Sequence, residues 1–195
     1  MKKNNALSIL IVLLLFGCFI HCKPAVNNDE QLAAKEHIND STGYLLSFND
    51  TLTDGYGYKN QKGEVIIPAG KYARCFTDTF KTYAIVAKPN SGFIAIDRQE
   101  NILYEVFIFD NGPDEISEGL FRIVKNKKIG YADFETGKIV IQPQFDCAFP
   151  FKNAAAKVSI DCKTESAGEH SAWISDHWYY IDKKGKKIEA PKTEE

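Results

Sequence analysis

The sequence predicts an all-β protein made of antiparallel β-hairpin or meander repeats, stacked as a partial propeller or an open solenoid. Three observations predict this fold. A pattern of strand, turn, β-branched run and proline recurs along the chain. Aromatic residues make up 12% of it, with a single Met, as suits ring-filled β layers. Each copy has only two or three short strands and cannot bury an apolar face alone, so the copies must stack. The pattern leaves closure into a ring open.

The third of four copies is the clearest. Residues 130–133 predict a short strand, followed by a tight turn in which Gly137 supplies a positive φ at no steric cost. The β-branched run 139–141 is typical of a buried strand. Pro143 is expected to stop that strand, because proline cannot donate to a ladder. Residues 154–158 then predict a further strand.

The other copies align with this one over their strands and turns. Residues 44–48 predict the first strand of the domain, and Pro68 is expected to end a strand of the first copy as Pro143 does in the third. In the second copy Asn101 takes the place of the turn glycine, since Asn tolerates that backbone region well. The aromatic residues that mark the four copies are Tyr58, Phe93, Tyr131 and Tyr180. The last interval is longer because residues 163–176 look like an insertion.

This pattern resembles the WG-repeat (or KWG-repeat) family of bacterial proteins. Units of that family run as Trp-Gly-Tyr-Ile-Asp, a charged turn with Gly, a Val/Ile run, Pro-x-Tyr-Asp and a final Phe-x-x-Gly-Leu-Ala-x-Val strand. The resemblance covers about residues 56–188. No copy keeps the Trp-Gly pair, which reads Tyr56-Gly57, Ser91-Gly92, Ile129-Gly130 and Trp178-Tyr179. The resemblance implies a repeat architecture and little chemistry.

The N-terminus has the features of an export signal. Lys2 and Lys3 precede an apolar core, residues 6–16, that is too short to span a bilayer comfortably. The sequence before Cys18 resembles a bacterial lipoprotein cleavage box, which implies cleavage after Gly17 and acylation of Cys18. Cys22 as the lipidated residue, plain secretion and an uncleaved anchor are the alternatives.

The chain divides accordingly into four parts. Residues 1–17 are the expected lipoprotein signal peptide, and residues 18–43 the lipidated Cys with a polar, flexible tether. Residues 44–190 are the repeat domain, and residues 191–195 a disordered tail. The expected location is outside the cytoplasm, anchored at the outer membrane, in the periplasm or on the cell surface. Two or more acyl chains give stable anchoring.

Overall composition argues against several partners. The net charge is −2 and 26% of residues are charged. Nucleic-acid binders have a basic patch or a basic pI, so no nucleic-acid partner is expected. No cofactor motif is present, and no cofactor is expected.

Three cysteines belong to the domain. In the repeat alignment Cys75 falls where Ala148 sits, and Cys147 lies one place earlier, so small buried packing positions are predicted. An exported domain permits a disulfide, but three thiols, with Cys162, leave at least one unpaired. A metal site of Cys147, Cys162 and His170 lacks a close Cys-x-x-Cys pair, so no metal is expected.

The catalytic signals are weak, and the chain is predicted not to be an enzyme. Ser175, Asp176 and His177 are adjacent in sequence, but nucleophilic catalysis depends on hydrogen-bond geometry, and a surface loop is the plainer interpretation. The acidic residues 110–118 are interrupted by Pro113, which spoils calcium-ligand spacing and favours a solvated loop. A cell-envelope hydrolase using these groups is the alternative.

The insertion concentrates the candidate binding residues, which are Trp173, His177, Trp178 and Tyr179. Exposed aromatic residues on a loop are typical of recognition sites. In the competing interpretation Trp178 and Tyr180 point inward as repeat core and only Trp173 lies near the surface. The prediction is a non-enzymatic module that binds a protein or glycan partner. A structural spacer without a specific ligand is a further alternative.

Overall fold

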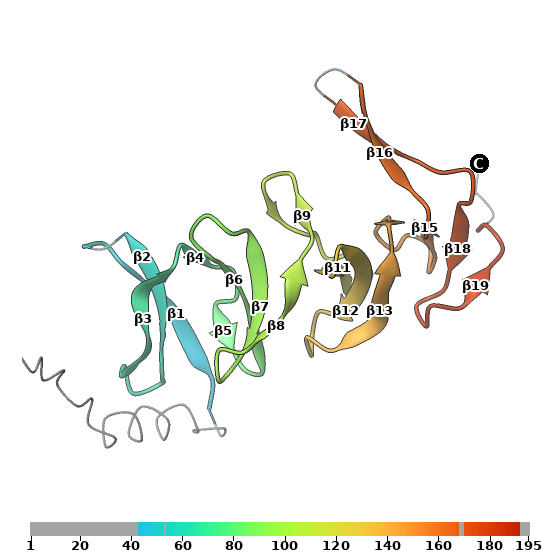
Figure 1. Cartoon of the computed structure of the whole chain (residues 1–195). Helices are drawn as coiled ribbons and strands as arrows, with labels where there is room; N and C mark the ends of the chain where they lie inside the picture. Colours follow the sequence, from blue (N-terminus) through green and yellow to red (C-terminus); the bar gives the residue numbers. More distant parts are fainter. Residues whose placement is uncertain (1–42, 53, 168–169, 192–195) are drawn as a thin grey trace, which may run out of the picture.

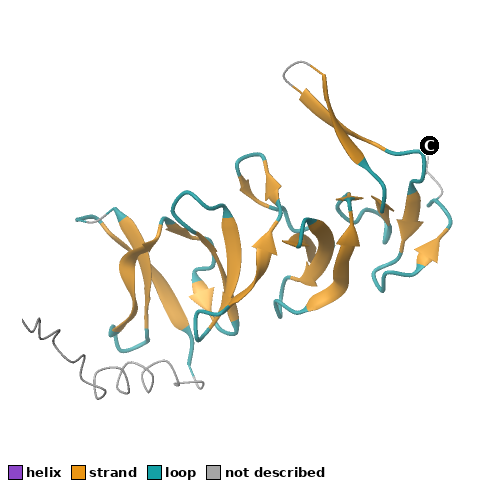
Figure 2. Cartoon of the chain, in the orientation of Figure 1, coloured by secondary structure: helices purple, strands orange, loops and turns teal. Residues whose placement is uncertain are grey.

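The structure is a computed structural model that describes residues 43–52, 54–167 and 170–191 (Figure 1). The predicted signal peptide, Cys18 and nearly all of the tether and the tail lie outside these residues. All regular secondary structure in the described part is β-strand (Figure 2), which confirms the all-β prediction. Within that part, no helix has the length and apolar character that crossing a membrane requires.

Four three-stranded antiparallel meanders form the body of the protein, and we name them units A to D. Unit A contains β1 (Leu45–Asp50), β2 (Gly55–Lys59) and β3 (Val65–Tyr72). Unit B contains β6 (Tyr83–Ala87), β7 (Phe93–Asp97) and β8 (Ile102–Val106). Unit C contains β11 (Leu120–Lys125), β12 (Lys128–Asp133) and β13 (Ile139–Phe145). Unit D contains β15 (Ala156–Ser159), β18 (Tyr179–Ile181) and β19 (Lys187–Ile188).

Short strand pairings connect each unit to the next one along the chain. β4 (Arg74–Cys75) leaves unit A and pairs with β6, while β14 (Cys147–Ala148) leaves unit C and pairs with β15. The end of β8 pairs directly with β11, so units B and C share a seven-stranded sheet. β5 (Thr79–Phe80) turns back to pair with β1. The units follow one another in a row, with units A and D at opposite ends (Figure 1).

The hydrophobic cores lie between units and not within them. Strand β6 illustrates this, because Ala84 and Val86 pack into the core between units A and B, whereas Tyr83 and Ile85 pack into the core between units B and C. A third core joins units C and D. Successive side chains of a strand point to opposite faces, so a sheet between two cores needs apolar residues at nearly every position. The copies therefore stack, as predicted.

A side-chain turn recurs in every unit and defines how the units align. Asn60, Asp97, Asp133 and Asp182 each accept hydrogen bonds from backbone N–H groups of the turn that follows. The turn residues with positive φ are Gly63, Glu100, Gly137 and Gly185. The prediction for Gly137 is confirmed, with φ 69°. The prediction for Asn101 is wrong, because Glu100, with φ 61°, takes the glycine's place.

The second copy is also shifted relative to the sequence alignment. A register shift occurs at the same place in three units, after Tyr58, Ala95 and Tyr131. Ala95 is thus the counterpart of the two tyrosines, and Phe93 is not. Phe93 and Ile94 occupy the Trp-Gly positions that had been assigned to Ser91 and Gly92. Because Gly92-Phe93 resembles Gly57-Tyr58, the sequence alignment placed the second copy two residues too early.

Proline does not stop the third strand of units A and C, contrary to the prediction. Both β3 and β13 run through their prolines, Pro68 and Pro143, and absorb them in a bulge where the ladder register shifts. The bulge brings the proline-bearing backbone close to a glycine of the second strand. An added Cβ at Gly130 would lie 2.5 Å from the Ile141 carbonyl oxygen and 2.6 Å from the Pro143 nitrogen.

Two hairpins interrupt the repeats and project to the same side of the row (Figure 1). The first is β9 (Ile108–Phe109) with β10 (Gly112–Pro113), between units B and C. The second is β16 (Lys163–Ala167) with β17 (His170–Ile174), inserted between the first two strands of unit D. The second hairpin is the insertion expected from the sequence. The first replaces part of what was expected to be a solvated acidic loop.

Candidate functional site

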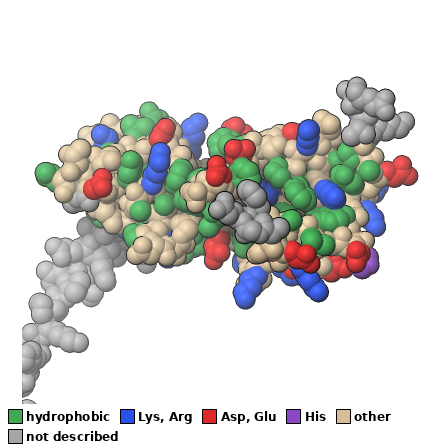
Figure 3. All heavy atoms as spheres, turned by 90° about the horizontal axis from the view of Figure 1, so that it is seen from above, with side chains coloured by type: hydrophobic (Ala, Val, Ile, Leu, Met, Phe, Trp, Pro, Cys, Tyr) green, Lys and Arg blue, Asp and Glu red, His purple; other side chains and the backbone are tan. Residues whose placement is uncertain are grey.

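A groove of about 600 Å³ lies between the two inserted hairpins. Its walls are residues 107–110 of the first hairpin and residues 171–173 of β17, and its base is formed by Arg122 with residues 149–150. Figure 3 views the molecule from the side to which both hairpins project, where hydrophobic side chains reach the surface among charged ones. The repeat packing does not account for this groove, since both walls are additions to the units.

Aromatic rings dominate the groove. The Trp173 ring packs edge-on against Phe107 and Phe149, with centroid distances of 5.8 Å and 5.4 Å. Ile108 is 56% exposed, Phe109 47% and Phe149 40%. Large apolar side chains gathered and exposed in one concave place are characteristic of interaction sites.

A buried ion pair holds the first hairpin against unit C. Arg122 and Asp114 are both buried. The Arg122 backbone N–H donates to the Asp114 carboxylate at 2.7 Å, its Nε donates at 3.0 Å, and its Nη1 donates to the Ala148 carbonyl at 3.1 Å. The guanidinium lies 4.0 Å from the centre of the Phe107 ring. The sequence had suggested that Asp114 lies in a solvated loop, and this is wrong, because Asp114 is buried.

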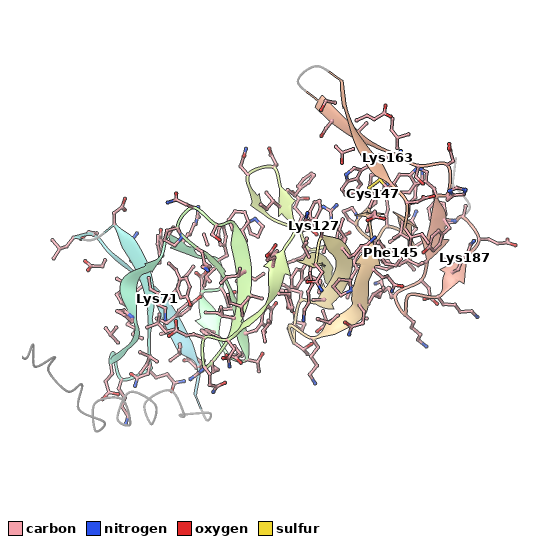
Figure 4. The ribbon with its side chains drawn as sticks, in the orientation of Figure 1. Lys71, Lys127, Phe145, Cys147, Lys163 and Lys187 are labelled. Atoms are coloured by element: carbon pink, nitrogen blue, oxygen red, sulfur yellow. A yellow bond between two sulfur atoms is a disulfide. The ribbon has the colours of Figure 1, made fainter. Side chains whose placement is uncertain are left out.

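A disulfide anchors the second hairpin. Cys147, in β14, is bonded to Cys162, one residue before β16, with 5.7 Å between their Cα atoms. Figure 4 labels Cys147 at the base of this hairpin, beside Lys163. Cys147 is buried, as predicted, but it is not a simple packing residue, because it forms the disulfide that the sequence analysis left open. The disulfide ties the start of the wall that carries Trp173 to β14.

Cys75 behaves as the alignment predicted. It is a buried free thiol and occupies the position of Ala148, each paired with the first strand of the next unit. Burial raises the pKa of the Cys75 thiol to about 11. The Cys147–Cys162 bond rules out these cysteines as metal ligands in this state. Among the described residues, no group of three or more His, Cys, Asp or Glu side chains is placed to hold a metal ion.

His177 contacts a carboxylate that is not the one adjacent to it in sequence. Its Nδ1 meets Asp161, and not the neighbouring Asp176. Asp161 also accepts hydrogen bonds from Ser175 Oγ at 2.7 Å and Ser159 Oγ at 2.8 Å. These two hydroxyls, together with His177, lower the pKa of Asp161 to about 2. The serines bond to the carboxylate, whereas a nucleophile would bond to the imidazole. The cluster fastens the chain that leads into β18.

The structure brings only one of the four predicted binding residues into the groove, namely Trp173. Trp178 is half-buried, 5.5 Å from the Phe149 ring and 4.9 Å from Lys157 Nζ. Tyr179 is half-buried against Phe145. His177 lies at the Asp161 cluster. Trp178 thus packs beside Phe149. Both tryptophans are half-buried, so exposure does not distinguish them, and only Trp173 lines the groove.

Phe107 was not among the candidates predicted from the sequence, although it occupies a repeat position. The backbone N–H groups of Phe76, Phe107 and Phe149 each donate to the first strand of the next unit, at 2.9, 3.1 and 2.9 Å. The three are thus one repeat position. The β9–β10 hairpin follows Phe107 immediately and hides it from alignment.

Comparison with known proteins agrees with this architecture. A sequence model of the family described as "WG containing repeat" matches residues 56–77 and 130–163. These segments begin in the second strand of unit A and of unit C, the two units that have the glycine and the bulged proline. The chain is thus an all-β repeat protein. Its matched segments are similar to WG containing repeats, which agrees with the resemblance seen in the sequence. No curated protein and no solved structure matches the chain.

Proposed function

We propose that this protein is an exported lipoprotein, anchored to a membrane through Cys18, whose repeat domain is a non-enzymatic binding module for a protein or glycan partner. The observation that carries the proposal is the aromatic groove between the two inserted hairpins. The buried members of the three cores come from the units and from the short segments between them, and of the hairpins only Trp173 packs against a core, as a partly buried residue at its edge.

Preorganised walls support a binding role. Arg122 and Asp114 hold one wall, and the Cys147–Cys162 disulfide holds the other. A site whose walls are already ordered loses less conformational entropy when a ligand binds. A spacer without a ligand would have no use for such a surface.

The disulfide also supports export, because disulfides persist in oxidising compartments outside the cytoplasm. Anchoring rests on the sequence of residues 1–22, which lie outside the described residues. We expect Cys18→Ala to leave the protein unprocessed or to release it from membranes. Intact mass and membrane partition measure both outcomes, and no change in either would contradict anchoring through Cys18.

A matched pair of variants tests the groove. Phe149 and Phe76 occupy the same repeat position in units C and A and are 40% and 36% exposed, but only Phe149 lines the groove. The full protein in detergent would be screened against arrays of glycans and of displayed peptides. We expect Phe149→Ala and Trp173→Ala to weaken the retained interactions about thirtyfold, as for hot-spot aromatics, and Phe76→Ala to leave them unchanged. Equal effects of Phe149→Ala and Phe76→Ala would contradict a role for the groove.

A further inference from the structure

We propose that the groove binds an extended peptide segment of a partner protein, which adds as a β-strand beside β17. This inference rests on the proposed binding function and specifies the partner's chemistry. It depends on three features of the groove, which are its free strand edges, its apolar lining and its one exposed charge.

Both walls present the edge of a strand to the groove. Side chains of a strand alternate between two faces, so a groove along one face would be lined by every second residue. Here three consecutive residues of β17, residues 171–173, and four consecutive residues at β9, residues 107–110, line it. β17 pairs only with β16 and β9 only with β10, so in the described chain each has one edge without a paired strand. Unpaired edges are templates for an added strand.

The lining suits peptide side chains better than sugars. A glycan presents hydroxyl groups that need polar partners, and an unpaired buried polar group is costly. Of the lining residues only Asp110, Ser171 and Arg122 have polar side chains, apart from the indole N–H of Trp173. The Arg122 side chain is only 4% exposed and is already bonded to Asp114 and Ala148. An added strand instead satisfies its own backbone at the edge and places apolar side chains against the aromatic rings.

Charge selects among peptides. The positive charge of Arg122 is balanced by Asp114 within the wall. Asp110, an exposed residue at the rim of the groove, then leaves a net negative charge. We therefore expect bound segments to combine apolar or aromatic residues with a Lys or Arg near one end.

The test uses a displayed library of random short peptides against the full protein in detergent. Peptides that bind the native protein and lose about thirtyfold with Phe149→Ala and also with Trp173→Ala, but not with Phe76→Ala, define groove ligands. One such peptide is then synthesised with a single N-methyl group at each backbone position in turn. Strand addition predicts that binding falls at alternate positions, because only every second amide of an added strand bonds to the edge. Asp110→Asn should weaken the basic peptides and reduce the salt dependence of their binding.

The possible results distinguish strand addition beside β17 from the more general binding function of the groove. Groove-dependent peptides with no alternation would overturn strand addition and leave the binding function intact. A glycan that binds in a Phe149-dependent way, with no peptide selected, would do the same. If neither library yields a ligand sensitive to Phe149→Ala, both the strand-addition inference and the groove function are overturned. Only alternating sensitivity in a Phe149-dependent peptide supports the inference.

Discussion

Units A and C differ from unit B at the crossing of the second and third strands. In units A and C a glycine, Gly57 or Gly130, faces a bulge at a proline. In unit B the corresponding residue is Ile94, which pairs with Glu105, and no proline is present in β8. The ladder of unit B shifts only after Ala95, whereas those of units A and C shift on both sides of the tyrosine. The glycine and the proline therefore occur together, because the bulge at the proline leaves no room for a Cβ on the residue opposite it. The two segments that match the family lie in the units that have this glycine and proline.

Unit B also differs from units A and C in which strand carries the buried tyrosine. Tyr131 in unit C is buried and lies opposite Ile141, as Tyr58 lies opposite Ile67 in unit A. In unit B the small residue, Ala95, is on the second strand and the aromatic one, Tyr104, is on the third. Each of these cross-strand pairs contains one buried tyrosine, on the second strand in units A and C and on the third strand in unit B, so the ring opposite Ala95 compensates for that small residue although the sequence pattern is not kept.

The largest effect should come from filling the glycine of the bulge. We expect Gly130→Ala to lower the free energy of unfolding by about 4 kcal/mol, because its methyl group would meet backbone atoms that cannot move aside. Gly112→Ala is the control, since an added Cβ there has its nearest neighbour at 3.6 Å. Urea unfolding followed by far-UV circular dichroism measures both. Equal midpoints for the two variants would refute the tight crossing in unit C.

The next largest effect should come from the turn glycine of unit C. Gly137→Val should lower the free energy of unfolding by about 3 kcal/mol, because Gly137 has φ 69° and its Cβ would enter the Tyr83 ring. Gly63→Val in unit A isolates the backbone contribution, since Gly63 has φ 86° with open space around it. If both variants melt at the same temperature, the Tyr83 contact contributes nothing.

A strand swap tests the compensation in unit B. Ala95→Tyr should overpack the core and destabilise by about 2 kcal/mol. Adding Tyr104→Ile reproduces the arrangement of units A and C and should recover part of that loss, although the bond from the Tyr104 hydroxyl to the Gly137 carbonyl, 2.7 Å, disappears. A double-mutant cycle should give a coupling of at least about 0.5 kcal/mol. Strict additivity would show that the two positions do not compensate.

The smallest effect should come from restoring the turn glycine of unit B. Glu100→Gly relieves a left-handed backbone that costs about 1–2 kcal/mol. It also removes the hydrogen bond from the Tyr72 hydroxyl, 2.9 Å, and the ion pair with Lys71, 2.7 Å. These contributions oppose each other, so we expect thermal unfolding to show a change within about 1 kcal/mol. A larger gain in stability would mean that the Tyr72 bond adds little.

The sequence predicted some of the features that local chemistry controls. Glycine at a positive φ and the small residue at Cys75 follow from single-residue preferences and were found where expected. The β-branched run 139–141 forms a strand, but only Ile141 is buried and Val140 is 44% exposed, and Pro68 and Pro143 do not end their strands. The register of unit B was not predictable in this way, because Phe93 has the same local preference as Tyr58. Only the ladder, with Ala95 opposite Tyr104, distinguishes them.

The groove was largely beyond sequence reasoning. Trp173 was identified as a candidate from its position on an insertion, but its partners, Phe107 and Phe149, lie far from it in the chain. Their contacts depend on two hairpins meeting above the row. Likewise Asp114 lies in a stretch whose composition is typical of a solvated loop. Its burial depends on the ion pair with Arg122 on β11, which the sequence does not show.

Cores that are shared between neighbours make the units unequal in how readily they open. Local opening of unit A or unit D exposes one core, whereas opening of unit B or unit C exposes two, so amide hydrogen exchange should be slowest in the middle of the row. The groove draws its walls from the B–C connection and from unit D. A ligand held there would join units B, C and D into one cooperative block, slow their exchange together, and leave unit A to fluctuate as before.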